Sequence, residues 1–405
     1  AQALLFAFSA LLSTGDSFAG VRLARMFGDN AVLQCEMPLP VWGWADPGET
    51  VSVEFAGQTV STVADSQSGR WRVTLAPVAA GGPYELKARG SSTVTAGNVL
   101  VGEVWFCAGQ SNMDLEVKNC TNAAAEIAAA RYPQIRFLFI SRVLANEPVE
   151  DISTWNGWVE CSPSTVGGYT GVGYFMARNL HQTLGRPVGI IQATYGGTRA
   201  ETWTPRETLA GDPVLAPILV DWPEMEKDVD WMYQDYLAYL VKVEQAKAAG
   251  QPIPVYYNAP TALYNGMVAP VMPFAIRGAA WYQGEGNDAR IQGYRTLLPA
   301  MIRGWRQNWG QGDFPFLFVQ LPNYEWGSNW PGLREAQSLA LDLANTGMAV
   351  TIDVGESQDI HPKNKQDVGR RLALIAQARI FGREVEYSGP VFRAATVEGD
   401  TVRIA

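Results

Sequence analysis

The chain has 405 residues, 47% of them apolar and 18% charged, so it can bury a sizeable core and is neither disordered nor limited to one small domain. Lys and Arg number 31 against 40 Asp and Glu, and the resulting net charge of −9 argues against nucleic acid as a partner. We expect one large domain and a smaller one.

The first 20 residues have the pattern of a secretory signal. An apolar block at residues 3–12 precedes small and polar residues and a Ser-Phe-Ala triplet at 17–19, the order found in the later part of such a signal. The block is too short to cross a bilayer, and no later stretch reaches the roughly 18 uninterrupted apolar residues that a span needs. We therefore expect a soluble protein that is periplasmic or secreted, without membrane insertion.

Residues 21–100 predict a small all-β sandwich. Apolar and polar residues alternate in short runs, as at Val51, Val53 and Phe55, which is the period of a strand with one buried face. Turn residues interrupt these runs about every 8–12 residues, as in small sandwiches. The module contains no polar cluster suited to catalysis, so we expect a structural or sugar-contacting role.

From residue 101 onward, apolar strands alternate with helical stretches. Strands are expected at residues 101–108, 188–193, 276–282, 316–321 and 348–353, and helices at 121–131, 173–184, 230–249 and 365–381. This alternation predicts a three-layer α/β domain with a mainly parallel sheet over residues 101–385. Residues 386–405 look like the start of a C-terminal β segment that would continue beyond Ala405. A lone hairpin is barely stable, so this segment should pair with another part of the protein.

The four cysteines do not have the spacing of a metal site. Cys120 and Cys161 lie in polar segments and are a candidate disulfide pair, which export would permit. Cys107 lies in an apolar run, which predicts a buried free thiol. The chain shows no metal-ligand cluster and no Gly-rich phosphate loop, so we expect neither a metal nor a cofactor.

The stretch VGEVWFCAGQSNM, residues 101–113, suggests a catalytic serine. Its apolar part predicts a strand buried on both faces. Ser111 follows on a sharp turn, where it would be exposed beside backbone N–H groups that can stabilise an oxyanion. An ordinary polar turn would look the same, so this hypothesis needs a base, an acid and oxyanion donors from elsewhere in the chain.

Reacting groups gather beyond the carboxyl ends of the strands in an open parallel sheet. Three further strands are followed by loops of suitable composition, namely Gly196-Gly197-Thr198, Gln283-Gly284-Glu285 and Asp359-Ile360-His361. The chain has two histidines, and His181 lies near the end of a helical stretch, where the helix dipole accounts for it. His361 is therefore the natural base for Ser111.

Two carboxylates compete for the role of orienting His361. Asp359 lies two residues before it, and Glu285 could be its neighbour in space. For the oxyanion we expect the nucleophile's own N–H, an N–H of Gly197 in a loop whose glycines allow close approach, and the side-chain amide of Gln283.

These motifs together resemble the sialate O-acetylesterase-type branch of the SGNH hydrolases, which includes bacterial carbohydrate acetylesterases. The resemblance rests on residues 109–113, 196–198, 264–267, 281–285 and 359–362 and spans nearly the whole chain. It implies an SGNH-like three-layer fold and the roles given above for the serine, the histidine, Gly197 and Gln283. SGNH enzymes commonly place the acid three residues before the histidine, but Gln358 occupies that position here, so Asp359 and Glu285 both stay open.

We predict a metal-independent serine esterase that removes O-acetyl groups from a carbohydrate through an acyl-enzyme. The resemblance implies sialic acid or a plant-type polysaccharide such as xylan or xyloglucan as the substrate. Gln110, Asn112 and Arg199 are candidate substrate-binding residues, the last for an acidic sugar, and residues 200–262 should shape the acceptor site.

Two other functions remain as alternatives. One is a non-catalytic carbohydrate-binding protein that uses its aromatic residues as a sugar platform. The other is a glycoside hydrolase with two carboxylates, Glu285 with Asp359 or Asp288. The sequence does not decide between the possible sugars, and it does not indicate an oligomeric state.

Overall fold

The computed structural model describes residues 20–325, 327 and 329–405. The predicted secretory signal, residues 1–20, therefore falls almost entirely outside the described residues. No helix in the described part of the chain combines the length and the apolar character that a bilayer span requires.

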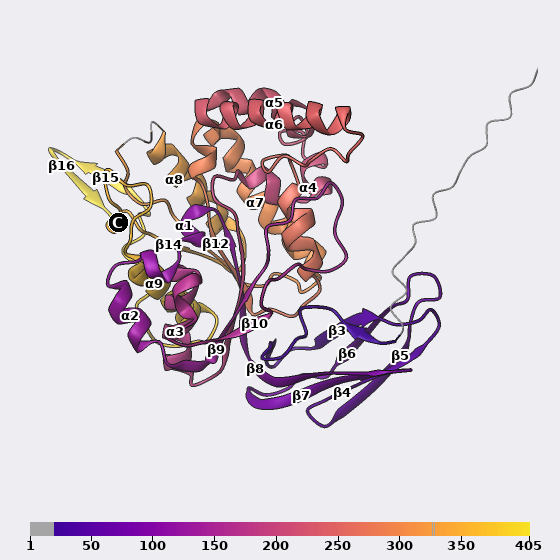
Figure 1. Cartoon of the computed structure of the whole chain (residues 1–405). Helices are drawn as coiled ribbons and strands as arrows, with labels where there is room; N and C mark the ends of the chain where they lie inside the picture. The colour runs from indigo at the N-terminus through magenta and orange to yellow at the C-terminus, as the bar shows by residue number, and fades with distance from the viewer. Residues whose placement is uncertain (1–19, 326, 328) are drawn as a thin grey trace, which may run out of the picture.

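The N-terminal residues form the predicted β-sandwich (Figure 1). Its strands are β1 (Arg22–Leu23), β2 (Val32–Gln34), β3 (Leu39–Trp44), β4 (Thr50–Phe55), β5 (Gln58–Val63), β6 (Arg70–Leu75) and β7 (Gly81–Arg89). Strands β1, β3 and β6 make one antiparallel sheet, and the others belong to the sheet that β8 (Thr93–Gly109) enters. Burial alternates strictly along β6, where Trp71, Val73 and Leu75 point inward, because successive side chains of a strand face opposite sides.

Strand β8 belongs to both parts of the molecule. Its first half pairs antiparallel with β7, and its second half lies parallel between β11 (Val188–Thr194) and β12 (Gly278–Tyr282). The change in sequence pattern near residue 101 therefore marks the point where one continuous strand becomes buried on both faces, and not a linker.

The part of the chain that follows the β-sandwich is a three-layer α/β structure with a mainly parallel sheet, as predicted. The strand order is β10-β9-β11-β8-β12-β13-β14, and only β10 is antiparallel to its neighbour. The remaining strands of this order are β9 (Tyr132–Phe139), β10 (Trp158–Cys161), β13 (Phe316–Val319) and β14 (Thr346–Ala349).

Helices cover both faces of this sheet, with α3 and α9 on one side and α7 on the other (Figure 1). The α-helices are α1 (Ser111–Asp114), α2 (Ala123–Ala129), α3 (Gly171–Leu184), α4 (Arg206–Ala210), α5 (Ile218–Met225), α6 (Asp230–Ala248), α7 (Ile291–Trp309), α8 (Trp330–Ser338) and α9 (Lys365–Arg379). Shorter helical turns are η1 (Val117–Asn119), η2 (Val166–Gly168), η3 (Ala200–Trp203), η4 (Glu226–Asp228), η5 (Tyr264–Val268), η6 (Ala269–Val271), η7 (Glu285–Arg290) and η8 (Leu339–Asp342).

Aromatic packing holds α7 to the sheet. Trp305 is fully buried, with its ring edge-on to Phe106 at 5.6 Å and to Trp281 at 5.7 Å between centroids. On the opposite face, Gly369 of α9 lets α3 approach closely, because a Cβ atom there would come within 2.7 Å of the Met176 backbone nitrogen. These contacts fix the sheet whose carboxyl edge carries the site.

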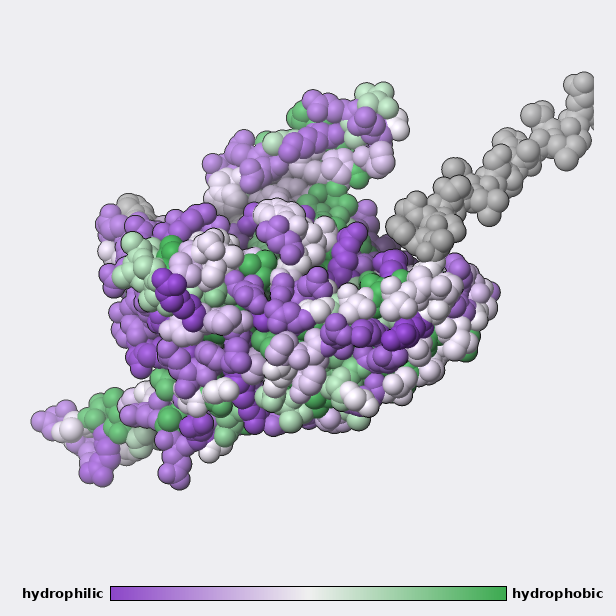
Figure 2. Space-filling model, turned by 60° about the horizontal axis from the view of Figure 1, so that its bottom comes forward, coloured by the Kyte–Doolittle hydropathy of each residue, from purple (hydrophilic) through white to green (hydrophobic). Residues whose placement is uncertain are grey.

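Two hairpins project from this body. The α5–α6 segment lies beyond the carboxyl edge of the sheet, and its outer surface mixes polar and apolar residues (Figures 1 and 2). The C-terminal strands β15 (Ala395–Glu398) and β16 (Thr401–Ile404) pair with each other, and every residue in them is exposed. Within the described residues this hairpin forms a sheet of its own, so the expected pairing with another segment is absent there.

The predicted pairing of Cys120 with Cys161 is wrong, because all four cysteines are free and buried. Cys120 packs beside Gly171, where its Sγ lies 3.4 Å from the carbonyl oxygen of Glu116. Cys161 ends β10. Cys107 is the buried free thiol that its apolar surroundings predicted, and burial raises its pKa to about 12. Polar neighbours in the sequence did not reveal that Cys120 and Cys161 point into the packed interior.

Candidate active site

Ser111 lies at the carboxyl edge of the sheet, directly after the central strand β8. The chain turns at Gly109, whose φ of +141° is a conformation that favours glycine. A Cβ atom at this position would lie 2.2 Å from the Tyr282 carbonyl oxygen, so glycine is also what allows β12 to pair this far along β8. The turn delivers Ser111 as the first residue of α1, partly exposed to solvent.

Ser111 and His361 meet, although 250 residues separate them in the chain. The Oγ atom of Ser111 lies 2.8 Å from Nε2 of His361, within hydrogen-bonding distance. The imidazole side chain is 40% exposed, so it can be reached from outside. The other histidine, His181, lies in the last turn of α3 with its Nδ1 2.7 Å from the Arg186 carbonyl oxygen, the structural position that its sequence context predicted.

Of the two candidate acids, Asp359 is the one beside the imidazole. Its Oδ1 accepts a hydrogen bond from the His361 backbone N–H at 2.8 Å and lies 4.0 Å from Nδ1. Glu285 has a different neighbour, since its Oε1 accepts a hydrogen bond from the Asn112 amide. Its second oxygen is enclosed and has no hydrogen-bond partner among the described residues.

A buried polar cluster lies beneath the serine and the histidine. The Asn112 amide donates to the Ile360 carbonyl oxygen at 2.9 Å and to Glu285, while its Oδ1 accepts from Nζ of Lys365 at 2.5 Å. Asn112 and Lys365 are both fully buried. The cluster therefore joins the loops after β8 and β12 to the loop before α9.

Burial and charge together set the protonation of this cluster. Burial lowers the pKa of Lys365 to about 8, against the attraction of Glu285, and burial raises the pKa of the Glu285 carboxyl. The pKa of His361 is lowered first by burial and then by the Lys365 ammonium, while Asp359 opposes both. A lowered pKa keeps the imidazole neutral near pH 7, which is the form that can accept a proton.

The sequence analysis missed Lys365. One signal was present, because the lysine follows the N-cap Asn364 and occupies the first position of α9. A cation is disfavoured by the helix dipole at that end. A lysine at such a position suggests that a specific partner holds it there.

The Gly196–Gly197 loop approaches the nucleophile as expected. A Cβ atom on Gly196 would lie 3.4 Å from the Ser111 Cβ, and Gly197 has a φ of +73°. Helix α1 begins at Ser111, so the N–H groups of Ser111 and Asn112 precede the first intrahelical hydrogen bond and remain as potential donors.

The Gln283 side chain, predicted as an oxyanion donor, is hydrogen-bonded to other protein groups in this structure, and donation to an oxyanion stays a prediction. The residue is fully buried, and its amide nitrogen donates to the Thr198 carbonyl oxygen at 3.1 Å and to Asn287 Oδ1 at 2.7 Å. The first bond ties the loop after β12 to the loop that contains Thr198, and the second lies within the loop after β12. Donation to a substrate oxyanion would require breaking one of them.

The three predicted substrate-binding residues are also buried, so their contacts are with the protein. Gln110 accepts hydrogen bonds from the backbone N–H of Gly286 at 3.1 Å, and Asn112 belongs to the cluster described above. Arg199 forms an ion pair with Glu226 at 3.2 Å and donates to the Met225 carbonyl oxygen. Each side chain is enclosed and its polar atoms bind other loops, and contact with substrate stays a prediction for all three.

Arg199 instead anchors the α5–α6 segment to the Gly-Gly loop. Its partner Glu226 also accepts a hydrogen bond from the Tyr256 hydroxyl at 2.9 Å. On the same segment, the Trp231 ring lies 3.2 Å from where a Cβ atom of Gly197 would be. Residues 200–262 therefore border the loop beside the nucleophile.

One group of side chains in the described part of the chain has a spacing that could hold a metal ion, namely Cys35, Glu36 and Glu103. It lies at the opposite end of the second half of β8 from Ser111. Glu103 is held there by Arg277 at 2.6 Å and by Arg186 at 2.9 Å. Two guanidinium groups in this position neutralise the carboxylates and repel a cation, so the group is an ion-pair network.

Comparison with known proteins shows clear relatives. The family described as "Carbohydrate esterase, sialic acid-specific acetylesterase" matches residues 240–377. The sialate O-acetylesterase of Mus musculus is 31% identical over 92% of this chain and 76% of that protein, and the Homo sapiens enzyme is 29% identical over 94% and 76%. The crystal structure of a carbohydrate acetylesterase from Xanthomonas citri superimposes with a TM-score of 0.80 at 35% identity, covering 95% of this chain and 81% of that one.

The position of Lys365 predicts how its charge acts on His361. In Lys365→Met the nearby positive charge is lost, so the imidazolium becomes easier to form and the pKa of His361 should rise. An NMR titration of the imidazole resonances measures this, with His181 as an internal reference. Lys363→Met is the matched control, since Lys363 is exposed and two residues away. A His361 pKa that stays constant or falls in Lys365→Met would contradict the electrostatic role.

Proposed function

This chain belongs to the sialate O-acetylesterase family and is a carbohydrate O-acetylesterase, and we propose that Ser111 is its nucleophile and His361 its general base. The observation that carries this assignment is the 2.8 Å contact between Ser111 Oγ and His361 Nε2. It provides a nucleophile within hydrogen-bonding reach of its base, the arrangement on which acyl-enzyme catalysis depends.

In the first half of the reaction, Ser111 Oγ attacks the acetyl carbonyl carbon while His361 Nε2 accepts the hydroxyl proton. The carbonyl oxygen becomes an oxyanion, for which the backbone N–H groups of Ser111 and Gly197 are the proposed donors. The tetrahedral intermediate collapses as the bond to the sugar oxygen breaks. His361 returns the proton to that oxygen, so the sugar leaves as an alcohol and the acetyl group stays on Ser111.

In the second half, water takes the place of the sugar. His361 accepts a proton from water as the water oxygen attacks the acetyl-serine, and it returns the proton to Ser111 Oγ when acetate leaves. Both halves need a neutral imidazole at the start. The lowered pKa of His361 supplies it.

We assign the carboxylate role to Asp359. It is the acid beside Nδ1, and its negative charge stabilises the imidazolium that forms when the proton is transferred. Glu285 is instead assigned the task of holding Asn112. This assignment also weakens the glycoside hydrolase alternative, because the Glu285 carboxylate is bound by Asn112 and its free oxygen is enclosed.

Replacing the nucleophile should abolish hydrolysis. Ser111→Ala is expected to lower kcat for acetate release from an acetylated glycan by about 10⁴-fold or more, as loss of a catalytic serine does in other enzymes. Labelling by an organophosphonate should disappear with it. Ser338→Ala, a serine on α8, is the control and should retain full activity. Full hydrolysis by Ser111→Ala would exclude the serine mechanism and revive the two-carboxylate alternative.

The choice between the two acids can be read from pH dependence. Asp359 raises the pKa of His361, so in Asp359→Asn the acidic limb of the kcat/KM profile should move to lower pH. In the same variant kcat should fall on the order of 10²-fold, the lower part of the range for proton transfer by a positioned side chain. Glu285→Gln serves for comparison, and its acidic limb should lie closer to that of the unchanged protein than the limb of Asp359→Asn does. A larger shift of the acidic limb in Glu285→Gln than in Asp359→Asn would assign the carboxylate role to Glu285.

We further propose that the protein is exported to the periplasm or secreted. The support is the apolar block at residues 3–12 followed by the small residues up to 19. When the chain is expressed with its natural leader, esterase activity should appear outside the cytoplasm, and mass spectrometry should find a mature N-terminus near residue 20 of this sequence. Activity confined to the cytoplasm on an uncleaved chain would refute export.

A further inference from the structure

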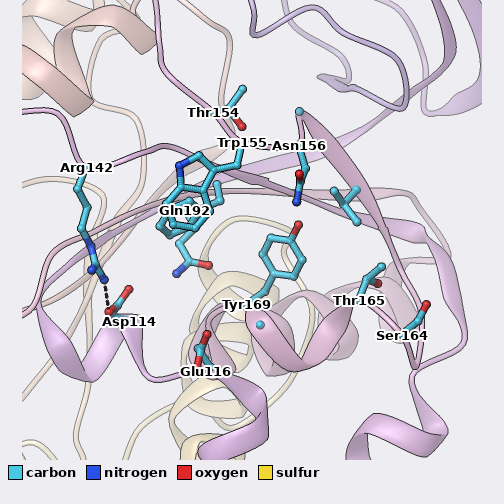
Figure 3. A pocket seen from close by; sticks show the side chains of 14 residues that line it. Asp114, Glu116, Arg142, Thr154, Trp155, Asn156, Ser164, Thr165, Tyr169 and Gln192 are labelled. Carbon is cyan, nitrogen blue, oxygen red and sulfur yellow. Dashed lines mark hydrogen bonds and ion pairs between the residues drawn. The ribbon is translucent and has the colours of Figure 1, made fainter.

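A cavity of about 450 Å³ opens beside the proposed active site (Figure 3). Its walls come from α1, from the loop after β9, from the loop before β10 and from the loop before α3. Among its lining residues are Asp114, Glu116, Arg142, Trp155, Asn156 and Tyr169. Its volume lies within the range of about 300–1,000 Å³ that is usual for small-molecule pockets.

The cavity borders the short helix that carries the nucleophile. Asp114 lines it and closes the four-residue helix that Ser111 begins, and side chains three apart on a helix have Cβ atoms about 5–6 Å apart. On a neighbouring wall, the Arg142 guanidinium lies 5.2 Å from the ring centre of Tyr195. Tyr195 directly precedes Gly196, where an added Cβ atom would lie 3.4 Å from the Ser111 Cβ.

The lining has the chemistry of a carbohydrate site. Trp155 is 78% exposed, and Phe139 supports its ring from beneath at 5.3 Å between centroids. Such a ring offers an apolar surface to the C–H face of a sugar. In Figure 3 the Asn156 amide and the Tyr169 hydroxyl point toward each other across the cavity, where they can bond sugar hydroxyls. The Tyr169 ring is fixed by stacking on Phe137 at 4.6 Å.

The charges in the lining favour a neutral ligand. Arg142 is paired with Asp114 at 2.6 Å, and Asp114 also accepts a hydrogen bond from the Thr194 hydroxyl. Glu116 is paired with Lys118 at 2.6 Å. The three charged groups of the lining are thus already paired with protein groups of opposite charge, so a ligand carboxylate would have to displace one of these partners in order to bind there.

We propose that this cavity is a second carbohydrate subsite, which binds a neutral sugar unit of the substrate while an acetylated neighbouring unit lies at Ser111. The proposal rests on the function proposed above, because only a nucleophile at Ser111 makes the occupant of the adjacent cavity part of the same substrate. It implies that the enzyme acts on an oligosaccharide or polysaccharide with neutral units, and that a single sugar uses only part of the available surface.

Kinetic discrimination tests the subsite. Chemically acetylated xylotetraose is compared with p-nitrophenyl acetate, which is too small to reach both sites. In Trp155→Ala the ratio of kcat/KM for the oligosaccharide to that for the small ester should fall about 10-fold, through a higher KM. Tyr169→Phe, which keeps the ring stack, should lower the ratio by a smaller factor. Phe392→Ala, an exposed aromatic residue in the C-terminal segment, is the control and should leave the ratio unchanged.

Calorimetry on the Ser111→Ala protein separates the subsite from the catalytic assignment. Xylotetraose or cellotetraose should bind to Ser111→Ala, more weakly by about 10-fold once Trp155→Ala is added, and 3′-sialyllactose should bind less well than either. Equal binding with and without Trp155, or a preference for the sialylated probe, would overturn the subsite. Retained ester hydrolysis by Ser111→Ala would overturn the proposed mechanism instead, and the binding data would still stand.

Discussion

The geometry of the site depends on the hydrogen bonds of the Asn112 side chain. Its amide bonds Glu285 and the Ile360 carbonyl oxygen, and its carbonyl oxygen accepts from Lys365, so one buried residue joins three loops. A buried amide whose hydrogen bonds are satisfied is rigid, and one with a missing partner is strongly destabilising. This asymmetry explains how a residue adjacent to the nucleophile can hold the histidine loop within 2.8 Å of it.

The same cluster places an ammonium group where water does not shield it. Burying a charge is costly unless it is paired, and Lys365 is compensated only in part by Asn112 and Glu285, as its pKa of about 8 reflects. Its field also lowers the pKa of His361. Asp359 acts in the opposite direction from the exposed side. The imidazole is therefore held between a buried cation and an exposed anion, and its basicity reflects the balance of the two.

Strand β8 and two ion pairs connect the site to the surrounding structure. Strand β8 ties the sandwich to the α/β sheet, so the turn at Gly109 is supported by pairing along 17 residues. The ion pair between Arg199 and Glu226 fastens the α5–α6 segment to the loop that contains Gly197. On the other side of the nucleophile, the Arg142–Asp114 pair forms a wall of the proposed subsite. One flank of the site is thus held by a buried ion pair, Arg199–Glu226, and the other carries a partly exposed one, Arg142–Asp114.

The sequence by itself determined the fold class, the main strands and the pairing of Ser111 with His361, because hydrophobic periodicity and the convergence of strand ends are local or topological properties. It missed α7, whose helical pattern contains Pro299 and two glycines, because tertiary packing of Trp305 overrides weak local propensity. Only the tertiary structure decided which way polar side chains point. Gln283 and Arg199 proved to bind other loops, and Lys365 entered the site, because the direction of a side chain depends on neighbours that are distant in the chain.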